Sequence, residues 1–218
     1  MKKIKTALIS VFNKSGLDIL LEKLNKLEVT FISTGGTHDY ILSQGYEATT
    51  VESLTTYPSI LGGRVKTLHP KVMGGILARG DNDSDNQQLK EYDIIPIDLV
   101  IVDLYPFEDT LLATDNEGEI IEKIDIGGIT LIRAAAKNFK DVLVVPSAEL
   151  YGRFVELLES KDGITDINDR KYYAAKAFNV SSHYDSAIFN WMNAGEIDSF
   201  KLSIGNGIGL RYGENPHQ

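Results

Sequence analysis

The sequence lacks two features that define large classes of proteins, cysteine and an excess of positive charge. With no cysteine among 218 residues, disulfide bonds, zinc thiolate sites and thiol nucleophiles are excluded. Lysine and arginine number 22 against 31 aspartate and glutamate residues, which gives a formal net charge of −9 at pH 7. We therefore expect neither nucleic acid nor an anionic membrane as a partner, because both need a broad basic face.

Long hydrophobic runs are missing as well. No apolar stretch approaches the roughly 18 residues that a transmembrane helix needs. Lysines before the apolar run of residues 6–12 resemble the start of a signal peptide, but the run is short and lacks a cleavage pattern. We interpret this run as a strand and expect a cytoplasmic protein. The four histidines are scattered without an HExxH pattern, so we expect no metal site.

The sequence does contain an alternation of β-branched runs and helical periods. Continuous apolar runs predict strands, and apolar residues at three- and four-residue spacing predict helices. The predicted strands are residues 6–12, 29–34, 46–51, 97–107 and 141–147, and the predicted helices between the first three are 15–27 and 35–45. This alternation indicates an α/β fold, a mainly parallel sheet with helices on both faces. The polar stretch of residues 79–88 is interpreted as a loop.

The sequence from Asp169 onward predicts one long helix, a C-terminal helical extension of the fold. From Asp169 onward an apolar stripe follows the four-three rhythm of a helix. The stripe consists of Tyr173, Ala177, Val180, Tyr184, Ala187 and Trp191. It is either a core-packing face or, because it is rich in aromatic residues, a subunit interface. The glycine- and serine-containing stretch after Asn193 is interpreted as a linker.

Two glycine-bearing turns, residues 10–16 and 33–38, directly follow predicted strands. Turns at the carboxyl ends of parallel strands are where open α/β sheets bind ligands. Each turn offers backbone N–H groups, hydroxyls and a helix N-terminus, which suit an anion, and Lys14 lies where a phosphate would sit. The alternative is a pair of ordinary helix caps. Neither turn is a Walker A or GxGxxG sequence, and GNGIG at 205–209 follows no strand.

The stretch GGRVKTLHP, residues 62–70, gathers positive charge in an acidic chain. Arg64 and Lys66 are two residues apart, so an extended backbone would point both side chains the same way. Thr67 adds a hydroxyl, and the glycines allow the backbone to approach a ligand closely. The alternative is a solvated basic loop. His69, which precedes a proline, is interpreted as a structural turn residue.

A third candidate site is IDIGGITLIRAAAKN, residues 124–138. Asp125 precedes a Gly-Gly pair that should open a helix running through Arg133 to Lys137. Complementarity with the helix dipole would by itself favour an acid at the start and bases at the end. Tyr105 lies close to the carboxyl end of the most apolar predicted strand, which is a suitable place for a site residue. The residues alone thus indicate an α/β protein that binds a small phosphorylated compound, with an undefined reaction.

Six motifs occur along the chain in an order and spacing shared with a known family. They are SVFNKSG, STGGT, GGRVKTLHP, DLYPF, IDIGG with RAAAKN, and RYGENPHQ. Together they resemble the bifunctional purine-biosynthesis proteins that carry AICAR transformylase and IMP cyclohydrolase activities. The resemblance implies an IMP cyclohydrolase domain of methylglyoxal synthase-like fold in residues 1–195. In residues 196–218 it implies a linker and the first motif of an otherwise missing transformylase domain, so we expect part of a longer protein without transformylase activity.

The resemblance also implies a reaction, the dehydrative ring closure of 5-formamido-1-(5-phosphoribosyl)imidazole-4-carboxamide to IMP, without cofactor or metal. Lys137 would be the proton donor and acceptor, and Asp125 would orient the carboxamide. Lys66 would stabilise the developing oxyanion, and Tyr105 would orient groups or relay a proton. The implied substrate-binding residues are Ser10, Phe12, Asn13, Lys14, Thr34, Gly35, Gly36, Thr37, Arg64, Val65, Lys66, Thr67, Val102, Asp103, Asp125 and Ile126.

Two features of this chain do not fit the residue roles that the resemblance implies. The family usually has Asn at the position of Asp103, and an ionised Asp accepts hydrogen bonds without donating any, so Asp103 either contacts donors on the substrate or does not touch it. Asp125 and Lys137 would lie about 18 Å apart along one straight helix. We predict that Asp125 lies on the loop before a helix that starts late or bends; a residue lent by a partner subunit is the alternative.

Two other functions are alternatives to IMP cyclohydrolase. A similar fold occurs in the allosteric domain of carbamoyl-phosphate synthetase, which binds nucleotides without turnover, and in methylglyoxal synthase. The joint presence of Lys66, Tyr105, Asp125 and Lys137 favours an enzyme over a binding module. The IDIGG, RAAAKN and RYGENPHQ motifs favour the purine protein, whose family forms homodimers, so we expect a homodimer.

Overall fold

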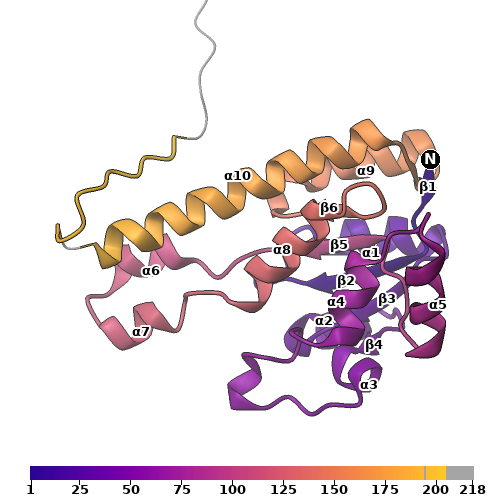
Figure 1. The fold of residues 1–218 in the computed structure, drawn as a ribbon, viewed down its shortest axis with the longest axis horizontal. Coiled ribbons are helices and arrows are strands. Elements are labelled where there is room, and N and C mark those ends of the chain that lie inside the picture. Colours follow the sequence, from indigo (N-terminus) through magenta and orange to yellow (C-terminus); the bar gives the residue numbers. More distant parts are fainter. Residues whose placement is uncertain (194, 205–218) are drawn as a thin grey trace, which may run out of the picture.

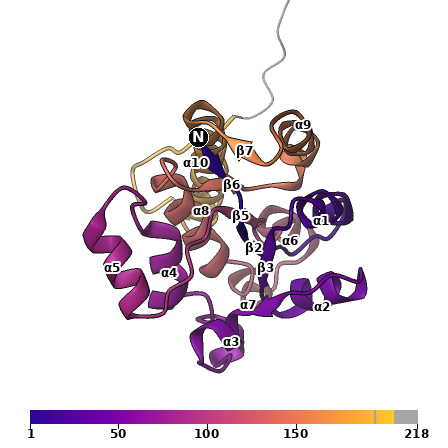
Figure 2. The same ribbon diagram turned by 90° about the vertical axis from the view of Figure 1, so that its right-hand side faces the viewer.

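The computed structural model describes residues 1–193 and 195–204, so the GNGIG and RYGENPHQ stretches lie outside the described residues. At its centre is a five-stranded, fully parallel sheet in the order β4-β3-β2-β5-β6. Its strands are β2 (Thr6–Ser10), β3 (Thr30–Ser33), β4 (Thr49–Thr50), β5 (Leu99–Val102) and β6 (Leu143–Val145). A small antiparallel pair, β1 (Lys2–Lys3) with β7 (Ile164–Thr165), lies next to it (Figures 1 and 2). The predicted parallel sheet is confirmed.

Helices cover both faces of this sheet because its strands are apolar on both sides. Successive side chains of a strand point to opposite faces, so Ala7 and Ile9 of β2 join one core cluster and Leu8 joins another. Figure 2 shows the two helix layers on either side of the strands. The first cluster is covered by α1 (Leu17–Lys26), α2 (Gly35–Ser43) and α9 (Tyr151–Lys161). The second is covered by α3 (Val51–Thr55), α4 (Pro70–Leu77), α8 (Gly127–Lys137) and α10 (Ile167–Met192).

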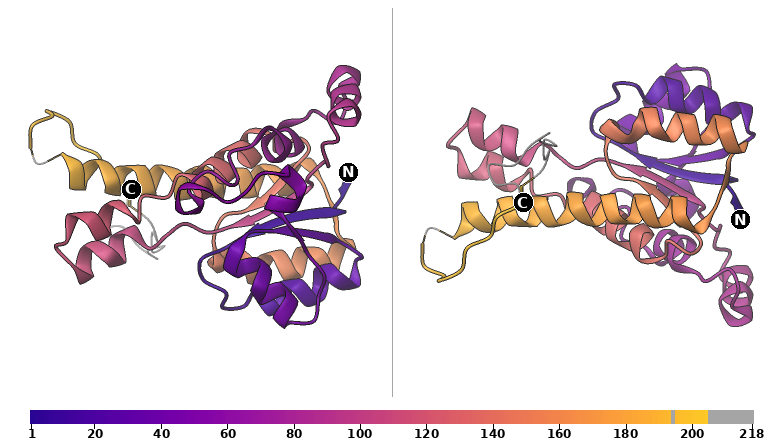
Figure 3. Two further views of the ribbon diagram at one scale, coloured as in Figure 1. Left: turned by 90° about the horizontal axis from the view of Figure 1, so that it is seen from below. Right: turned by 90° about the horizontal axis from the view of Figure 1, so that it is seen from above.

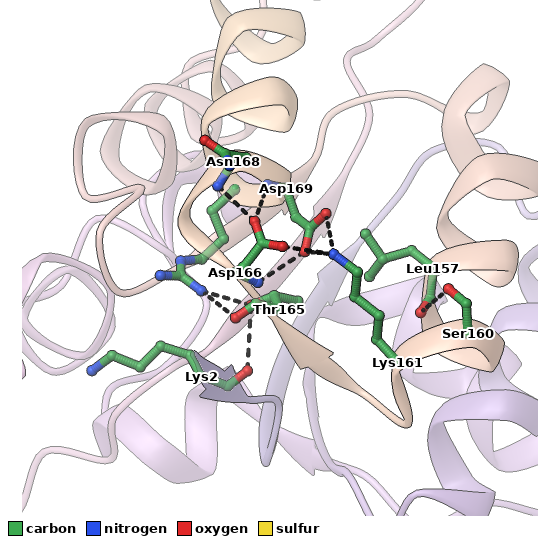
Figure 4. Close-up of polar contacts among 9 residues, drawn as sticks. Lys2, Leu157, Ser160, Lys161, Thr165, Asp166, Asn168 and Asp169 are labelled. Atoms are coloured by element: carbon green, nitrogen blue, oxygen red, sulfur yellow. Dashed lines mark hydrogen bonds and ion pairs between the residues drawn. The ribbon is translucent and has the colours of Figure 1, made fainter.

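Helix α10 is anchored at its start by a polar cluster (Figure 4). The Asp166 side chain accepts hydrogen bonds from the N–H groups of Asn168 and Asp169, and the Asp169 carboxylate accepts from the Asp166 N–H. This reciprocal capping satisfies backbone donors that a helix N-terminus otherwise leaves free. Lys161 binds both carboxylates, at 2.8 and 2.6 Å. The anchor fixes the direction in which the long helix leaves the sheet.

The aromatic stripe of α10 packs on all three core clusters of the described residues. Tyr173 joins the first, Ala177 the second, and Tyr184 with Trp191 the third. The core-packing interpretation of the stripe is therefore confirmed, and a role in a subunit interface stays a prediction.

The third cluster belongs to an arm that projects beyond the sheet. Helices α6 (Phe107–Ala113) and α7 (Glu117–Ile121) pack against the carboxyl-terminal half of α10 (Figures 1 and 3). The chain between β5 and α8 thus leaves the sheet, runs along α10 and returns at Gly127. Among the described residues, no helix combines the length and apolar character that crossing a membrane requires.

Three local expectations were wrong in extent. The strand expected over residues 97–107 is confined to Leu99–Val102, and Phe107 already begins α6. The strand expected over residues 46–51 is confined to Thr49–Thr50, because the Thr50 hydroxyl accepts the Ser53 N–H and starts α3. The loop expected over 79–88 contains the start of α5 (Asp83–Glu91), which buries no residue. Its start is stabilised locally, since the Asn82 side chain accepts the Asp85 N–H and Arg79 pairs with Asp85.

Candidate active site

A cavity of about 980 Å³ opens at the carboxyl ends of β2 and β5. This is the edge at which parallel α/β sheets bind ligands. Its wall comes from the turn after β2, the segment around the 3-10 helix Leu61–Gly63, and the chain from Asp103 to the first turns of α8. Nine of the predicted site residues line it: Ser10, Phe12, Arg64, Lys66, Thr67, Asp103, Tyr105, Asp125 and Ile126.

The other predicted residues lie outside the cavity lining. They are Asn13, Lys14, Thr34, Gly35, Gly36, Thr37, Val65, Val102 and Lys137. Several adjoin it, because the Thr34 hydroxyl is 2.9 Å from that of Ser10 and the Thr37 hydroxyl bonds the backbone of Val11. The Val102 side chain is buried in the core between the sheet and α8. Substrate contacts by any of these residues stay predictions.

The N-terminus of α2 and the turn after β2 form one polar corner. The Lys14 ammonium donates to the carbonyl oxygens of Val11 and Phe12, at 2.7 and 2.9 Å. Burial lowers the pKa of Lys14, and the charge of Asp103 acts in the opposite direction. Gly35 has a φ of 42°, and a Cβ there would lie 3.2 Å from the Lys66 ammonium, so the missing side chain leaves room for this cation.

The GGRVKTLHP segment is a series of turns, and the expectation of an extended backbone was wrong. Leu61, Gly62 and Gly63 all have positive φ, at 52°, 67° and 83°, a conformation that glycine adopts without strain. The curled backbone still directs Arg64 and Lys66 to the cavity.

Within this segment, Arg64 forms an ion pair with Glu122 on the opposite wall. Thr67 is buried, at 4% exposure. The interpretation of His69 as a turn residue is confirmed, since its Nδ1 accepts the Lys71 N–H at 3.1 Å and caps α4.

Asp103 holds the turn after β2. Its two carboxylate oxygens accept the N–H groups of Phe12 and Asn13, the latter at 2.9 Å. Burial raises the pKa of Asp103, while these two N–H groups and the charge of Lys14 hold it down. The carboxylate that stands where the family usually has Asn is therefore engaged with backbone donors.

Asp125 lies on the loop before α8, as predicted. The Gly128 N–H donates to its Oδ1 at 2.7 Å, and burial raises the pKa of the carboxyl against the effect of this and neighbouring N–H groups. Burial likewise raises the pKa of Tyr105, with added contributions from the charges of Asp125 and Asp103. Both groups are thus partly withdrawn from water on one wall of the cavity.

Lys137 does not join the cavity of its own chain. It occupies the last turn of α8 and is exposed, about 15 Å along the helix axis from Gly127. Helix α8 starts just after Asp125 and continues to Lys137, so neither a later start nor a bend shortens this separation. The other alternative, a residue lent by a partner subunit, stays a prediction.

Sequence reasoning missed two charged residues of the cavity, Glu122 and Lys123. The Lys123 ammonium lies 5.6 Å from the centroid of the Phe12 ring and 5.7 Å from that of Tyr105, within the range of cation–π attraction. These two rings meet edge to face at 5.5 Å. The only signal in the sequence was adjacency to Asp125, which did not distinguish the pair from surface charges.

The charged groups that line the cavity indicate a class of protein. Three cations line the cavity: Arg64 and Lys66 come from the segment after the 3-10 helix, and Lys123 comes from the chain that also carries Asp125 and leads into α8. Such a site suits an anionic small molecule and acid–base chemistry on it. Among the described residues, no group of three or more acidic or histidine side chains is arranged to hold a metal ion. The class is an α/β protein with a cavity at the carboxyl edge of a parallel sheet.

Comparison with known proteins identifies the family. Residues 16–130 match the family described as "MGS-like domain", and residues 135–218 match "AICARFT/IMPCHase bienzyme". The chain belongs to the MGS-like domain family, and the resemblance to the bifunctional purine-biosynthesis proteins is confirmed.

Individual relatives agree with this assignment. The bifunctional purine biosynthesis protein PurH of Bacteroides thetaiotaomicron is 57% identical over 217 residues, which are 100% of this chain and 43% of that protein. PurH of Clostridium botulinum (strain Langeland) is 45% identical over 216 residues, covering 99% of this chain and 43% of the relative. The crystal structure of ForH superposes with a TM-score of 0.73 at 34% identity, covering 85% of this chain and 97% of ForH. The chain thus spans less than half the length of these PurH relatives.

Proposed function

We propose that this chain is an IMP cyclohydrolase, which closes 5-formamido-1-(5-phosphoribosyl)imidazole-4-carboxamide to IMP with loss of water. The observation that carries the proposal is the joint placement of Lys66, Tyr105 and Asp125 in one cavity beside a phosphate-suited corner. The matches to PurH and to the AICARFT/IMPCHase bienzyme support the choice of reaction. A nucleotide-binding module without turnover would need no acid–base groups in this position.

The proposed reaction needs three kinds of assistance from the protein. The carboxamide nitrogen attacks the formyl carbon, the new C–N bond forms, and the formyl oxygen takes up negative charge. Asp125 accepts a hydrogen bond from the carboxamide and orients it, and the α8 N-terminus with Lys66 stabilises the oxyanion. Protons then move from nitrogen to oxygen, which leaves as water; Tyr105, whose raised pKa keeps it protonated, can relay one of them.

The proposed phosphate position is the corner between the α2 N-terminus and the turn after β2. In the proposal, the phosphate would be bound by the hydroxyls of Ser10, Thr34 and Thr67 and the side chains of Arg64 and Lys14, beside Gly35, Gly36 and Thr37; the hydroxyls of Ser10 and Thr34 already lie 2.9 Å apart. Helix N-termini favour phosphate through free N–H groups and the helix dipole. Holding the phosphate and the carboxamide of one molecule at opposite ends supplies attack geometry, and this chemistry requires no cofactor.

The proposed acid–base role of Lys137 requires a second copy of the chain, because Lys137 lies far from the cavity of its own chain. In a symmetric dimer, Lys137 from one protomer would then complete the site of the other. The test uses Lys66→Met and Lys137→Met, with Lys90→Met as a control at an exposed site on α5. Formation of IMP from the formamido ribonucleotide is followed by absorbance.

Each outcome of this test is interpretable. The proposal expects a parent chain that forms IMP, a control like the parent, and two variants with severe losses. Mixing the two inactive variants should restore about a quarter of the parent activity, because half of the random dimers are mixed and each holds one intact site. No restoration on mixing would refute the lent lysine, and a parent chain that binds IMP without forming it would refute the enzyme.

A further inference from the structure

Tyr184 of α10 reaches the loop that carries Asp125. Its hydroxyl accepts the Asp125 N–H at 2.9 Å and donates to the Lys123 carbonyl oxygen at 2.5 Å. One hydroxyl therefore ties two backbone groups on either side of residue 124. Both of these residues line the cavity, whereas Tyr184 itself does not.

The position of the Tyr184 ring is set by packing. The residue is 7% exposed and its ring meets that of Phe107 at a centroid distance of 6.0 Å, and Phe107 in turn meets Trp191 at 5.9 Å. Burial raises the pKa of Tyr184 to about 12, so the hydroxyl keeps its proton at neutral pH and makes both bonds. The tyrosine is thus a rigid support, in contrast to a mobile surface contact.

The loop that it supports is tied to α7 by the N–H groups of residues 122–124, whereas the Asp125 N–H bonds the Tyr184 hydroxyl. Residues 122–126 between α7 and α8 belong to no helix or strand. The Asp125 carboxylate is held from one side by the Gly128 N–H at 2.7 Å, and the Asp125 N–H is held from the other by Tyr184. Without the tyrosine hydroxyl, the Lys123 carbonyl and the Asp125 N–H would both lose a partner in a largely enclosed position.

We propose that Tyr184 is a positioning residue of the site, which holds the Asp125 carboxylate and the Lys123 ammonium in place from the C-terminal helix. The inference rests on the proposed function for its kinetic consequence, and on geometry alone for its structural one. It assigns part of the site to α10, whose stripe the sequence marks as a core-packing face or a subunit interface.

The chain provides a matched control on the same helix. Tyr173 is also buried, but its hydroxyl has no hydrogen-bond partner among the described residues. Tyr173→Phe and Tyr184→Phe therefore remove the same atom from the same helix and keep both rings packed. Only the second change removes hydrogen bonds to the Asp125 loop.

The kinetic test compares cyclisation by the parent and both variants. Tyr184→Phe should lower kcat at least about tenfold, since a misplaced catalytic group is costly, with little change in KM; Tyr173→Phe should match the parent. When Asp125→Ala is already present, adding Tyr184→Phe should lower kcat little further. If Tyr184 acts through Asp125, the effects of the two substitutions are not additive. Equal losses in both backgrounds, or none in either, would overturn the inference.

A second readout does not depend on activity. The Asp125 amide proton should exchange faster in Tyr184→Phe than in the parent chain and in Tyr173→Phe, because only this variant frees it. If the parent chain proves inactive, the proposed function fails while the exchange measurement still decides the inference. Unchanged exchange at Asp125 in Tyr184→Phe would refute it.

Discussion

The tight contact between Gly128 and Asp125 yields a quantitative prediction about the site. A Cβ on Gly128 would lie 2.6 Å from the Asp125 Oδ2 and 3.2 Å from the backbone oxygen of Asp103. The backbone oxygen cannot yield easily, but the carboxylate can turn away. Ordinary contact begins near 3.4 Å, so in Gly128→Ala the carboxylate must retreat by about 0.8 Å.

A retreat of that size matters for catalysis more than for folding. A misplacement of about 1 Å in a reacting group costs about a hundredfold in rate, so Gly128→Ala should lose between ten and about a hundredfold in kcat/KM. Its stability should fall little or even rise, because alanine is favoured over glycine in helices by up to about 1 kcal/mol.

The matched control is Gly152→Ala. Gly128 and Gly152 are each the second residue of an eleven-residue helix, but a Cβ on Gly152 would meet nothing within 4 Å. Steady-state cyclisation and thermal unfolding of both variants separate the two effects. Parent-like activity in Gly128→Ala would show that the carboxylate position is not critical, and the role given to Asp125 would have to be abandoned.

Three further predictions follow from burial and packing. In the proposed reaction Asp125 works as a carboxylate, and its pKa is raised, so the acid limb of kcat/KM should lie above the ordinary aspartate value of 3.8; a limb at or below 3.8 in a pH profile would contradict this. Burial also raises the pKa of Asp98, so its ionisation costs stability as pH rises through that pKa. Asp98→Asn should then unfold at a higher temperature than the parent at pH 7, with a gain that shrinks as the pH falls. A Cβ on Gly75 would lie 2.4 Å from the Ile95 carbonyl oxygen, so Gly75→Ala should destabilise the fold by about 1–3 kcal/mol in urea unfolding.

The strands that could be predicted from the sequence are those that are buried on both faces. Residues of β5, for example, are all buried, and such a run has few alternatives to a central parallel strand. The edge strand β4 was overestimated because its end depends on one hydroxyl, that of Thr50, which starts a helix. Helix α5 was missed because it buries no residue, and therefore has no apolar period to detect.

The site residues that could be predicted are those that follow a strand or belong to a recognisable motif. Ser10, Tyr105 and Asp125 each reach the cavity through their own segment, so local pattern was sufficient. Lys123 and Tyr184 could not be found in this way, because their roles depend on how α10 packs against the loop before α8. A tyrosine at helical spacing gives the same sequence pattern in both cases: when its hydroxyl has no hydrogen-bond partner among the described residues, as in Tyr173, and when the hydroxyl bonds a loop of the site.

Helix geometry also decides which cations can act within one chain. An eleven-residue helix is about 16 Å long, so α8 can present Asp125 at its start or Lys137 at its end to a single cavity, but not both. Within one protomer the ammonium groups that line the cavity are Lys66 and Lys123. If Lys137 is chemically required, the chain must associate to be active, and its specific activity should fall on dilution below the dimer dissociation constant. If activity is independent of concentration in a monomer, the proton transfers have to be carried by the lysines already in the cavity.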